Sequence, residues 1–254
     1  MATGISAVII THNEAHNIGR CLASLKPVAD ELIVVDSGST DGTADIAEQA
    51  GARVFQRDWK GFSAQKNEAN SLATQPYILS MDSDEALSPE LEKSLLQVKT
   101  AGATGAYGFA RLTNYCGTWV RHGGWYPDRK VRLFPKEGTR WEGEHVHETL
   151  ALPKGCTVHW LKGDLLHYSY HSRQNHIDRI ERYSTLHAEK MKAEGKGPNA
   201  WKPWLSPIAK FVQGYLLQGG FLDGSAGWHI ARLSAWAVHL KYCKLNALLA
   251  DDRT

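Results

Sequence analysis

Cysteine is scarce in this chain of 254 residues, and its spacing excludes two classes of protein. The four cysteines are far apart and form no Cys-x-x-Cys pair: Cys21, Cys116, Cys156 and Cys243. Such spacing indicates neither a zinc knuckle nor a disulfide framework. We therefore expect a protein that works in a reducing compartment.

Long hydrophobic runs and an N-terminal targeting segment are also lacking. No window offers about 18 uninterrupted apolar residues, the minimum for a helix that spans a membrane. The opening MATGISAVII has no basic segment before its apolar stretch, which is too short for the core of a signal peptide. We expect a cytoplasmic protein that crosses no membrane.

An excess of charge of either sign is nearly absent. The chain has 29 Lys and Arg against 27 Asp and Glu, so its net charge is +2 with the 12 histidines neutral. No overall basic field favours DNA or RNA as the main partner. The 43% of hydrophobic residues suffice for one sizeable core, or for one domain with a helical appendage.

The first hundred residues alternate apolar strands with helical patterns. Ile18, Cys21, Leu22 and Leu25 are spaced i, i+3, i+4 and i+7, which is typical of an amphipathic helix with one face on a sheet. The alternation predicts βαβ units, a parallel sheet and the α/β class. We predict strands at 6–10, 31–36, 53–56 and 77–81, and helices at 15–26, 43–50, 64–73 and 89–100.

The rest of the chain changes character twice. Residues 107–170 form short strand-like pieces rich in Trp, Tyr, Gly and His, which predict a mixed extension of the sheet that covers a pocket. Helical patterns follow at 173–194 and from about 203 to 249. We predict one domain over 1–170 and a helical region over 171–254.

Acidic side chains follow the predicted strands where each strand ends. Glu14 follows the first strand, and Asp36 ends the second. Asp82 and Asp84 follow the fourth, at the edge where open α/β sheets bind ligands. Because alternate residues of an extended segment point the same way, both should face one divalent cation that carries phosphates. A solvated loop before the helix cap at Ser88 is the alternative.

Small and polar residues surround these acids. Asn13 is a candidate ligand residue beside Thr11, although capping of the next helix alone would explain it. Ser39 lies in VVDSGSTDGT, whose small residues allow a ligand to approach closely; a turn before a capped helix is the alternative. Neither the dinucleotide-binding nor the P-loop signature is present at these turns.

A further acidic cluster, WEGEHVHE, begins at Trp141. As a strand it would place Glu142, Glu144 and Glu148 on one face, and one of them could be a general base. Glu148 is our first candidate and Glu144 our second, the alternative being acids on a surface strand.

Several cations and histidines are candidates for contacts with phosphate or metal. Lys66 on the third predicted helix can offset phosphate charge, although a solvated lysine is equally ordinary. His167 and His171 can complete a metal shell or contact a pyrophosphate, although 12 histidines make chance placement common. The same two interpretations hold for Arg129, Lys130 and Arg132.

Taken together, residues 11–14, VVDSGSTDGT and YILSMDSDE resemble the nucleotide-sugar motifs of family 2 glycosyltransferases. RLF at 132–134, WEGEHVHE, LLHYSYHS at 165–172 and GGFLDGSAGWHIA at 219–231 resemble the β-1,4-glucosyltransferase subgroup that modifies the heptose of the lipopolysaccharide inner core. The resemblance implies the GT-A fold: a mixed, mostly parallel sheet flanked by helices, here with a C-terminal helical extension. It also implies nucleotide-sugar binding by residues 1–100 and acceptor binding with catalysis by 101–170.

The resemblance further implies a role for each candidate. Thr11, Glu14 and Asp36 hold the uridine, Asp82 lies against the ribose or the metal, and Asp84 binds Mg²⁺ or Mn²⁺. With the candidates argued from the residues alone, the full set comprises nucleotide-sugar contacts at Thr11, Asn13, Glu14, Asp36, Ser39, Lys66 and Asp82, metal ligands at Asp84, Asp82 and His167, and a base at Glu148 or Glu144.

The implied reaction is a single inverting displacement that moves a hexose, glucose in this subgroup, from a UDP-sugar to a heptose hydroxyl of lipopolysaccharide. An enzyme of the same fold acting on another glycan, lipid or protein is the alternative. Three other readings are a nucleotidyltransferase, an inert nucleotide-sugar-binding protein, and a zinc hydrolase that uses His145, His147, His167 and His171. The sequence contains neither the glycine-rich phosphate loop that is usual in a nucleotidyltransferase nor an HExxH helix that would support a zinc hydrolase.

Aromatic and basic residues are interleaved from Trp201 onward, a composition that suits an anionic bilayer surface. Packing of the aromatics on the catalytic domain is the alternative. We expect peripheral contact with the inner face of the inner membrane, where a lipid-anchored acceptor would lie. The residues are Trp201, Trp204, Phe211, Tyr215, Phe221, Trp228, Trp236 and Tyr242, with Lys202, Lys210, Arg232, Lys241 and Lys244.

Overall fold

The computed structural model describes residues 2–143 and 148–251, and the chain forms two compact units. Unit 1 is Met1–Arg111 with Asp128–Tyr168, and unit 2 is Leu112–Pro127 with Ser169–Thr254. The sequence predicted one boundary after residue 170. The excursion of residues 112–127 into unit 2 was not predicted, because nothing in the local pattern marks where a strand leaves one unit for another.

Unit 1 contains every helix and strand predicted for the first hundred residues, with ends within two residues of the prediction. Its helices are α1 Ala15–Leu25, α2 Thr43–Gln49, α3 Phe62–Ser71 and α4 Pro89–Ala101. Its strands are β1 Ile5–Thr11, β2 Glu31–Asp36, β3 Arg53–Gln56, β4 Tyr77–Asp82, β5 Glu85–Leu87, β8 Asp128–Pro135, β9 Arg140–Glu142 and β10 Thr149–Ala151. Two longer strands begin in unit 1 and end in unit 2: β6 Ala106–Tyr115 and β11 Val158–Tyr170.

The main sheet has the strand order β3-β2-β1-β4-β8-β6-β11-β5. The strands β3, β2, β1 and β4 are parallel, whereas β8 joins β4 and β6 antiparallel, and β5 joins β11 antiparallel. A small antiparallel pair, β9 and β10, lies outside this sheet. The predicted class, a mixed sheet flanked by helices with a C-terminal helical region, is confirmed.

Alternation along the central strands divides the core of unit 1 between the two faces of the sheet. Ile5, Ala7 and Ile9 of β1 pack with the apolar face of α1 and with α4, all fully or almost fully buried. Val8 packs on the opposite face with residues of α3 and with Trp141. A strand buried on both faces is typical of parallel sheets, and it brings the carboxyl ends of β1, β2 and β4 to one edge.

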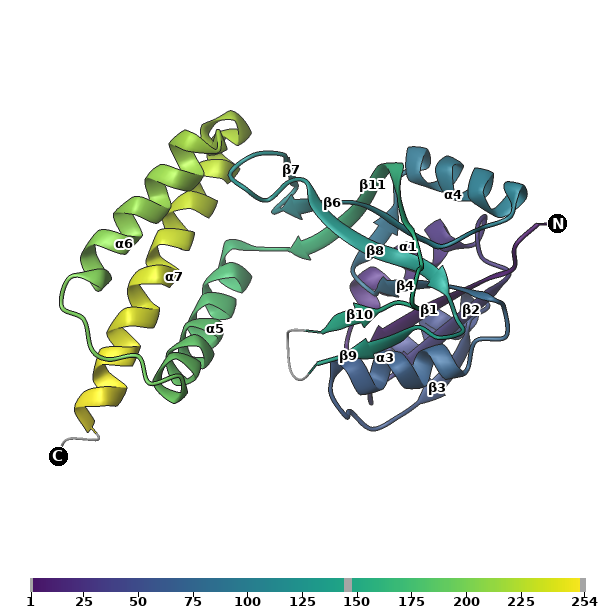
Figure 1. Ribbon diagram of the computed structural model, residues 1–254, viewed down its shortest axis with the longest axis horizontal. Coiled ribbons are helices and arrows are strands. Elements are labelled where there is room, and N and C mark those ends of the chain that lie inside the picture. Colours follow the sequence, from purple (N-terminus) through teal and green to yellow (C-terminus); the bar gives the residue numbers. More distant parts are fainter. Residues whose placement is uncertain (1, 144–147, 252–254) are drawn as a thin grey trace. The chain divides into compact units, whose positions relative to one another are not determined.

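Unit 2 is largely helical, as the sequence predicted. It contains β7 Thr118–Val120, α5 Arg173–Ala193, α6 Lys202–Phe211, a π-helical turn η1 Val212–Leu217, a 3₁₀ turn η2 Gly220–Asp223 and α7 Gly224–Asp251. The helices α5 and α6 both pack against α7 (Figure 1). In the described residues no helix is both long enough and apolar enough to cross a membrane.

Candidate functional site

The carboxyl edge of β1, β2 and β4 opens into a pocket of about 480 Å³. Small-molecule sites range over roughly 300–1,000 Å³, so this volume suits a nucleotide. Three predicted residues line it, namely Thr11, Glu14 and Asp82. The other lining residues are Ile10, His12, Ser37, Trp59, Phe62 and Ser83.

The pocket combines an unpaired polar atom with an aromatic wall. The side-chain hydroxyl of Thr11 is buried and has no hydrogen-bond partner among the described residues. Such a group favours a ligand that supplies the missing bond. Trp59 and Phe62 form the aromatic wall. They are 50% and 37% exposed, and their ring centroids are 4.8 Å apart. Sequence reasoning missed these two, although aromatics on either side of Gly61 just before a helix were a usable signal.

Asn13, Ser39 and Asp36 shape the loops at this edge. The Asn13 backbone N–H donates to Ser39 Oγ over 2.8 Å, and its side-chain oxygen accepts from the N–H of Thr40 over 2.9 Å. The interpretation of Asn13 as a helix cap is wrong, because Glu14 is the N-cap residue of α1 and Asn13 bonds the neighbouring loop. Asp36 is fully buried and accepts from the Ser39 N–H over 2.9 Å. Direct contact of these three with a ligand stays a prediction.

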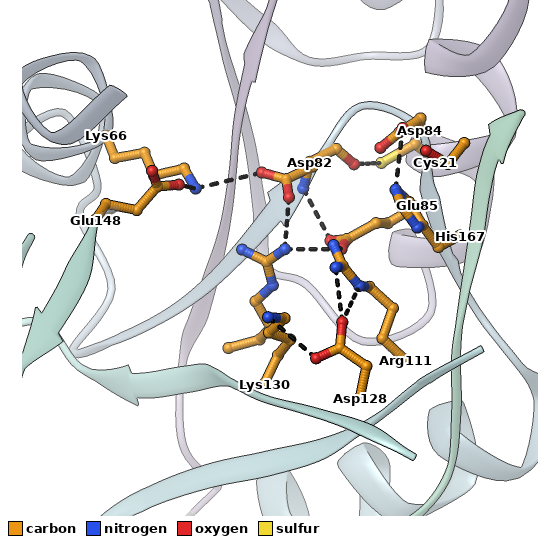
Figure 2. A network of polar contacts seen from close by, with 12 residues as sticks. Cys21, Lys66, Asp82, Asp84, Glu85, Arg111, Asp128, Lys130, Glu148 and His167 are labelled. Carbon is orange, nitrogen blue, oxygen red and sulfur yellow. Dashed lines mark hydrogen bonds and ion pairs between the residues drawn. The ribbon is translucent and has the colours of Figure 1, made fainter. Parts of the chain in front are cut away.

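Lys66 reaches the same edge from α3, as predicted, but it is not a solvated lysine. Its side chain is only 4% exposed, and its Nζ lies 2.8 Å from Glu148 Oε1 and 3.4 Å from Asp82 Oδ1. The ammonium group also lies 4.6 Å from the ring centroid of Trp141. Figure 2 shows Lys66 between the two carboxylates. Lys66 therefore joins the end of β4 to the residue before β10.

Arg132 of β8 holds the other side of Asp82. Its Nη2 donates to Asp82 Oδ2 over 2.5 Å and to Glu85 Oε1 over 2.7 Å. Burial by itself would raise the pKa of Asp82, but the charges of Arg132 and Lys66 outweigh it and hold that pKa well below its usual range. Burial by itself would lower the pKa of Arg132, and the two carboxylates instead raise it. Both groups therefore stay charged at neutral pH.

The chain of charges continues away from the pocket. Arg111 donates to Asp128 Oδ2 from Nε over 2.9 Å and from Nη2 over 2.7 Å, and its Nη1 lies 3.4 Å from Glu85. Lys130 Nζ lies 3.1 Å from Asp128 Oδ1, and Figure 2 draws this contact as a dashed line. Arg129 is exposed and lies over the ring of Trp160. Of the three basic candidates on β8, only Arg132 contacts a predicted site residue among those that the structure describes.

The expectation that Asp82 and Asp84 share one extended segment is wrong. The strand β4 ends at Asp82, and residues 83–84 form a turn before β5, fixed by a 3.0 Å bond from the Asp82 N–H to Glu85 Oε2. Asp82 faces Lys66 and Arg132, whereas Asp84 Oδ2 lies 3.2 Å from His167 Nε2 on β11 (Figure 2). Across residues 2–143 and 148–251, no group of three or more His, Cys, Asp and Glu side chains is gathered as a metal site.

Asp84 and His167 nevertheless suit a divalent ion that brings ligands of its own. Mg²⁺ is commonly bound by one or two carboxylates together with substrate phosphates, and imidazole is an accepted ligand of related ions. The two side chains are partly buried, with 20% and 13% exposed, so a ligand can reach them. They fit Mg²⁺ or Mn²⁺ as a partial set of ligands, while Asp82 as a ligand stays a prediction.

The acidic cluster after Trp141 is not one strand. Glu142 on β9 is the register partner of Thr149 on β10, and the two strands are antiparallel. Because β9 and β10 run in opposite directions, and Gly143 after β9 has a φ of +98°, Glu142 and Glu148 do not share a strand face. Glu144, His145 and His147 lie outside the described residues. Glu148 is placed at the site through Lys66, whereas His171 belongs to unit 2.

Comparison with known proteins gives a consistent picture. Residues 6–154 match the model of the family described as glycosyl transferase family 2. An uncharacterized glycosyltransferase of Rickettsia felis is 30% identical over 266 residues, which cover 98% of this chain and 92% of that protein. The lipopolysaccharide core biosynthesis glycosyltransferase LpsC of Rhizobium meliloti is 30% identical over 262 residues, 98% of this chain and 96% of LpsC.

Among solved structures, glucosyl-3-phosphoglycerate synthase from Mycobacterium tuberculosis, in complex with Mn²⁺, UDP and glucosyl-3-phosphoglycerate, is 26% identical to this chain. The similarity covers 44% of each chain, with a TM-score of 0.37.

Proposed function

Because the chain belongs to glycosyl transferase family 2 and has the mixed, helix-flanked sheet expected of the GT-A fold, we propose that it is an inverting hexosyltransferase with a UDP-sugar as donor. The observation that carries this proposal is the pocket at the carboxyl edge of β1, β2 and β4. Acids, an unpaired hydroxyl and an aromatic wall meet there, beside the buried cation Lys66.

In this proposal the nucleoside occupies the pocket. Thr11 Oγ1 and the Glu14 carboxylate bond the uracil, and the exposed rings of Trp59 and Phe62 cover its apolar surface. Asp82, fixed by Arg132, accepts from a ribose hydroxyl. Asp36 and Ser39 keep the loop after β2 in shape, and their own contact with the nucleoside stays a prediction.

The diphosphate then lies toward Lys66, Asp84 and His167. Lys66 offsets phosphate charge, and Asp84 with His167 would hold Mg²⁺ or Mn²⁺, with donor oxygens completing the shell. When bound, such an ion neutralises charge that develops on the departing UDP.

Glu148 is the proposed general base. It accepts the proton of the acceptor hydroxyl while the oxygen attacks the anomeric carbon and the bond from that carbon to the phosphate oxygen breaks. One displacement inverts the anomeric centre, and UDP leaves. In the absence of substrate, the ion pair with Lys66 holds Glu148 in place.

The proposed acceptor is a heptose of the lipopolysaccharide inner core, and the proposed sugar is glucose. The similarity to LpsC over nearly the whole of both chains supports an acceptor of this class. The motif resemblance to inner-core glucosyltransferases supports the sugar. A lipid-linked acceptor would place the enzyme at the inner face of the inner membrane.

A transfer assay tests the reaction. The purified enzyme is incubated with UDP-glucose, Mn²⁺ and a truncated heptose-terminated core, and the products are analysed by mass spectrometry and by NMR of the new linkage. We expect one added hexose in the β configuration. Glu148→Gln should lower the rate at least about a hundredfold, as loss of a general base does, while Glu142→Gln should behave like the wild type. An α-linked product would contradict the single displacement.

A further inference from the structure

Large apolar side chains are exposed in one short part of unit 2. Of the 15 exposed large hydrophobic residues in the described part of the chain, ten lie between residues 201 and 228. We call eight of them the ridge, with exposures from 49% to 78%: Trp201, Trp204, Leu205, Ile208, Leu216, Leu217, Phe221 and Leu222. Patches of this kind on a soluble surface mark an interaction site.

Helical geometry places the first half of the ridge on one side of α6. Trp201, Trp204, Leu205 and Ile208 are spaced three and four residues apart, so they share one face. The other face already has a partner. Pro203 is buried, Ser206 and Pro207 are half-buried, and α6 packs on α7. The ridge residues therefore cannot turn inward.

The second half of the ridge rests on an aromatic cluster. Phe211, Tyr215 and Trp228 pack together with ring centroids 5.3 to 5.4 Å apart, and Phe221 lies 6.3 Å from Tyr215. The aromatic residues that the sequence predicted at a membrane surface therefore fall into two groups. Phe211 and Tyr215 are half-buried, whereas Trp201 and Trp204 are 74% and 67% exposed.

Charge indicates what covers the ridge. Residues 195–250 contain six Lys and Arg and one acid, Asp223, whereas the remaining residues contain 23 Lys and Arg and 26 Asp and Glu. The single acid is 6% exposed and bonds the backbone N–H of His122 over 2.8 Å. Lys196 and Lys244 are paired with Glu194 and Glu181. Among the described residues of unit 2, no carboxylate pairs with the other four cations, which are Lys202, Lys210, Arg232 and Lys241.

From the exposed ridge and the scarcity of acids in residues 195–250, we propose that α6, η1 and η2 form an interfacial anchor that lies in the surface of an anionic lipid bilayer. Tryptophans at one end, leucines and phenylalanine at the other, and an excess of Lys and Arg over acids form the composition of such segments. This proposal adds a membrane contact to the proposed function. It rests on that function in one respect, the lipid-linked acceptor. An acidic protein partner or a second copy of the chain would give other results in the test below.

Vesicle sedimentation tests the anchor with the full chain. Vesicles of phosphatidylethanolamine with phosphatidylglycerol, which carry no sugar acceptor, are compared with vesicles of phosphatidylcholine. The anionic vesicles should bind the wild type more tightly, and binding should weaken as salt screens the lysines. Leu205→Asp with Ile208→Asp should lower binding by about tenfold or more, because two charges enter the apolar contact.

A matched control uses exposed apolar residues of α5. Leu186 and Tyr183, 45% and 41% exposed, lie outside the ridge, so Leu186→Asp with Tyr183→Asp adds the same charge and should keep at least half of the binding. Circular dichroism confirms that both variants fold. Should the ridge variant not fold, quenching by brominated lipid replaces it, because Trp201→Phe with Trp204→Phe should remove most of the quenching seen for the wild type.

Three results would overturn the proposal: equal binding to both kinds of vesicle, equal binding by the ridge and control variants, or unchanged quenching in the tryptophan variant. A dimer of the wild type that becomes a monomer in the ridge variant, without vesicle binding, would assign the ridge to a second copy. UDP-glucose hydrolysis is measured on the same preparations, so failure of the anchor and failure of the proposed donor chemistry are distinguishable.

Discussion

Lys66 joins two parts of the proposed reaction. It is almost fully buried, and its ammonium group lies between Asp82, on the donor side, and Glu148, the proposed base. A diphosphate that draws Lys66 toward itself would weaken its ion pair with Glu148 and leave that carboxylate free to accept a proton. Donor binding would then precede activation of the acceptor.

Replacing Lys66 tests this role. Lys66→Met should raise the KM for UDP-glucose by about ten- to a hundredfold, because a charged hydrogen bond to phosphate is lost. Steady-state kinetics measure the change. Lys60→Met is the control, since Lys60 is 61% exposed and only pairs with Glu68 over 3.5 Å. Equal KM values for the two variants would place the diphosphate elsewhere.

Among the residues of unit 1, we expect replacement of Arg132 to lower the free energy of unfolding the most. Arg132→Met removes the shortest ion pair of both Asp82 and the almost fully buried Glu85, leaving each with one cation 3.4 Å away, and breaking a buried pair costs about 3–5 kcal/mol. Urea unfolding measures the loss. Arg129→Met, at an exposed position, should change stability by less than about 0.5 kcal/mol.

A second substitution separates charge from packing. If the loss reflects an uncompensated buried carboxylate, adding Glu85→Gln to Arg132→Met should restore part of the stability. A double variant less stable than Arg132→Met alone would mean that packing of the arginine side chain dominates.

At the scale of elements, α4 depends on a cap that was predictable. Ser88 Oγ accepts the N–H of Leu91 over 3.2 Å and also the N–H of Asp164 over 3.0 Å. Ser88→Ala should therefore cost about 1–2 kcal/mol in urea unfolding. Thr100→Ala, on the same helix and exposed, should cost less than about 0.5 kcal/mol. A loss at Ser88 no larger than that at Thr100 would contradict the cap.

The first turns of α5 contain a histidine that makes unit 2 sensitive to acid. Burial, with a smaller effect of Arg179, lowers the pKa of His176 to about 4, and its Nδ1 lies 3.1 Å from the hydroxyl of Tyr115. The ordinary value is about 6.5, so the unfolded chain takes up the proton first as pH falls. Stability should be unaffected above about pH 6.5 and fall by about 3 kcal/mol between there and pH 4.

Thermal unfolding across this pH range checks the effect. His176→Phe retains a ring among Tyr115, Trp125 and Tyr170 but cannot take up a proton, so its pH dependence should be flatter. His187→Phe, at an exposed position of the same helix, should retain the dependence of the wild type. A wild-type curve that is flat between pH 6.5 and 4 would contradict burial of a neutral His176.

At the scale of the whole molecule, the local sequence pattern predicted those helices and strands whose buried side chains follow a single regular period. The buried positions Ile18 and Leu22 of α1 and the strand ends at Thr11 and Asp36 follow from such periods. The sequence did not predict the turn after Asp82. That turn depends on one specific hydrogen bond, from the Asp82 N–H to Glu85, and on the long-range pairing of β5 with β11.

Long-range pairing also explains the other differences. The buried position of Lys66 depends on Glu148, which is 82 positions away, a distance that no local period records. The passage of residues 112–127 into unit 2 depends on where β6 ends relative to β7. The candidate residues were therefore mostly predictable, whereas their pairing was not.

Titration calorimetry of UDP, with and without Mn²⁺, into the wild type and Asp84→Asn tests most directly whether the strand edge of unit 1 is the donor site. We predict that UDP binds the wild type and that Mn²⁺ tightens binding by about tenfold or more, an increment that Asp84→Asn loses because only His167 remains of the pair. Asp45→Asn on α2, in contrast, should retain the increment. UDP that binds with the same affinity with and without Mn²⁺ in all three proteins, or does not bind at all, would contradict the donor site proposed here.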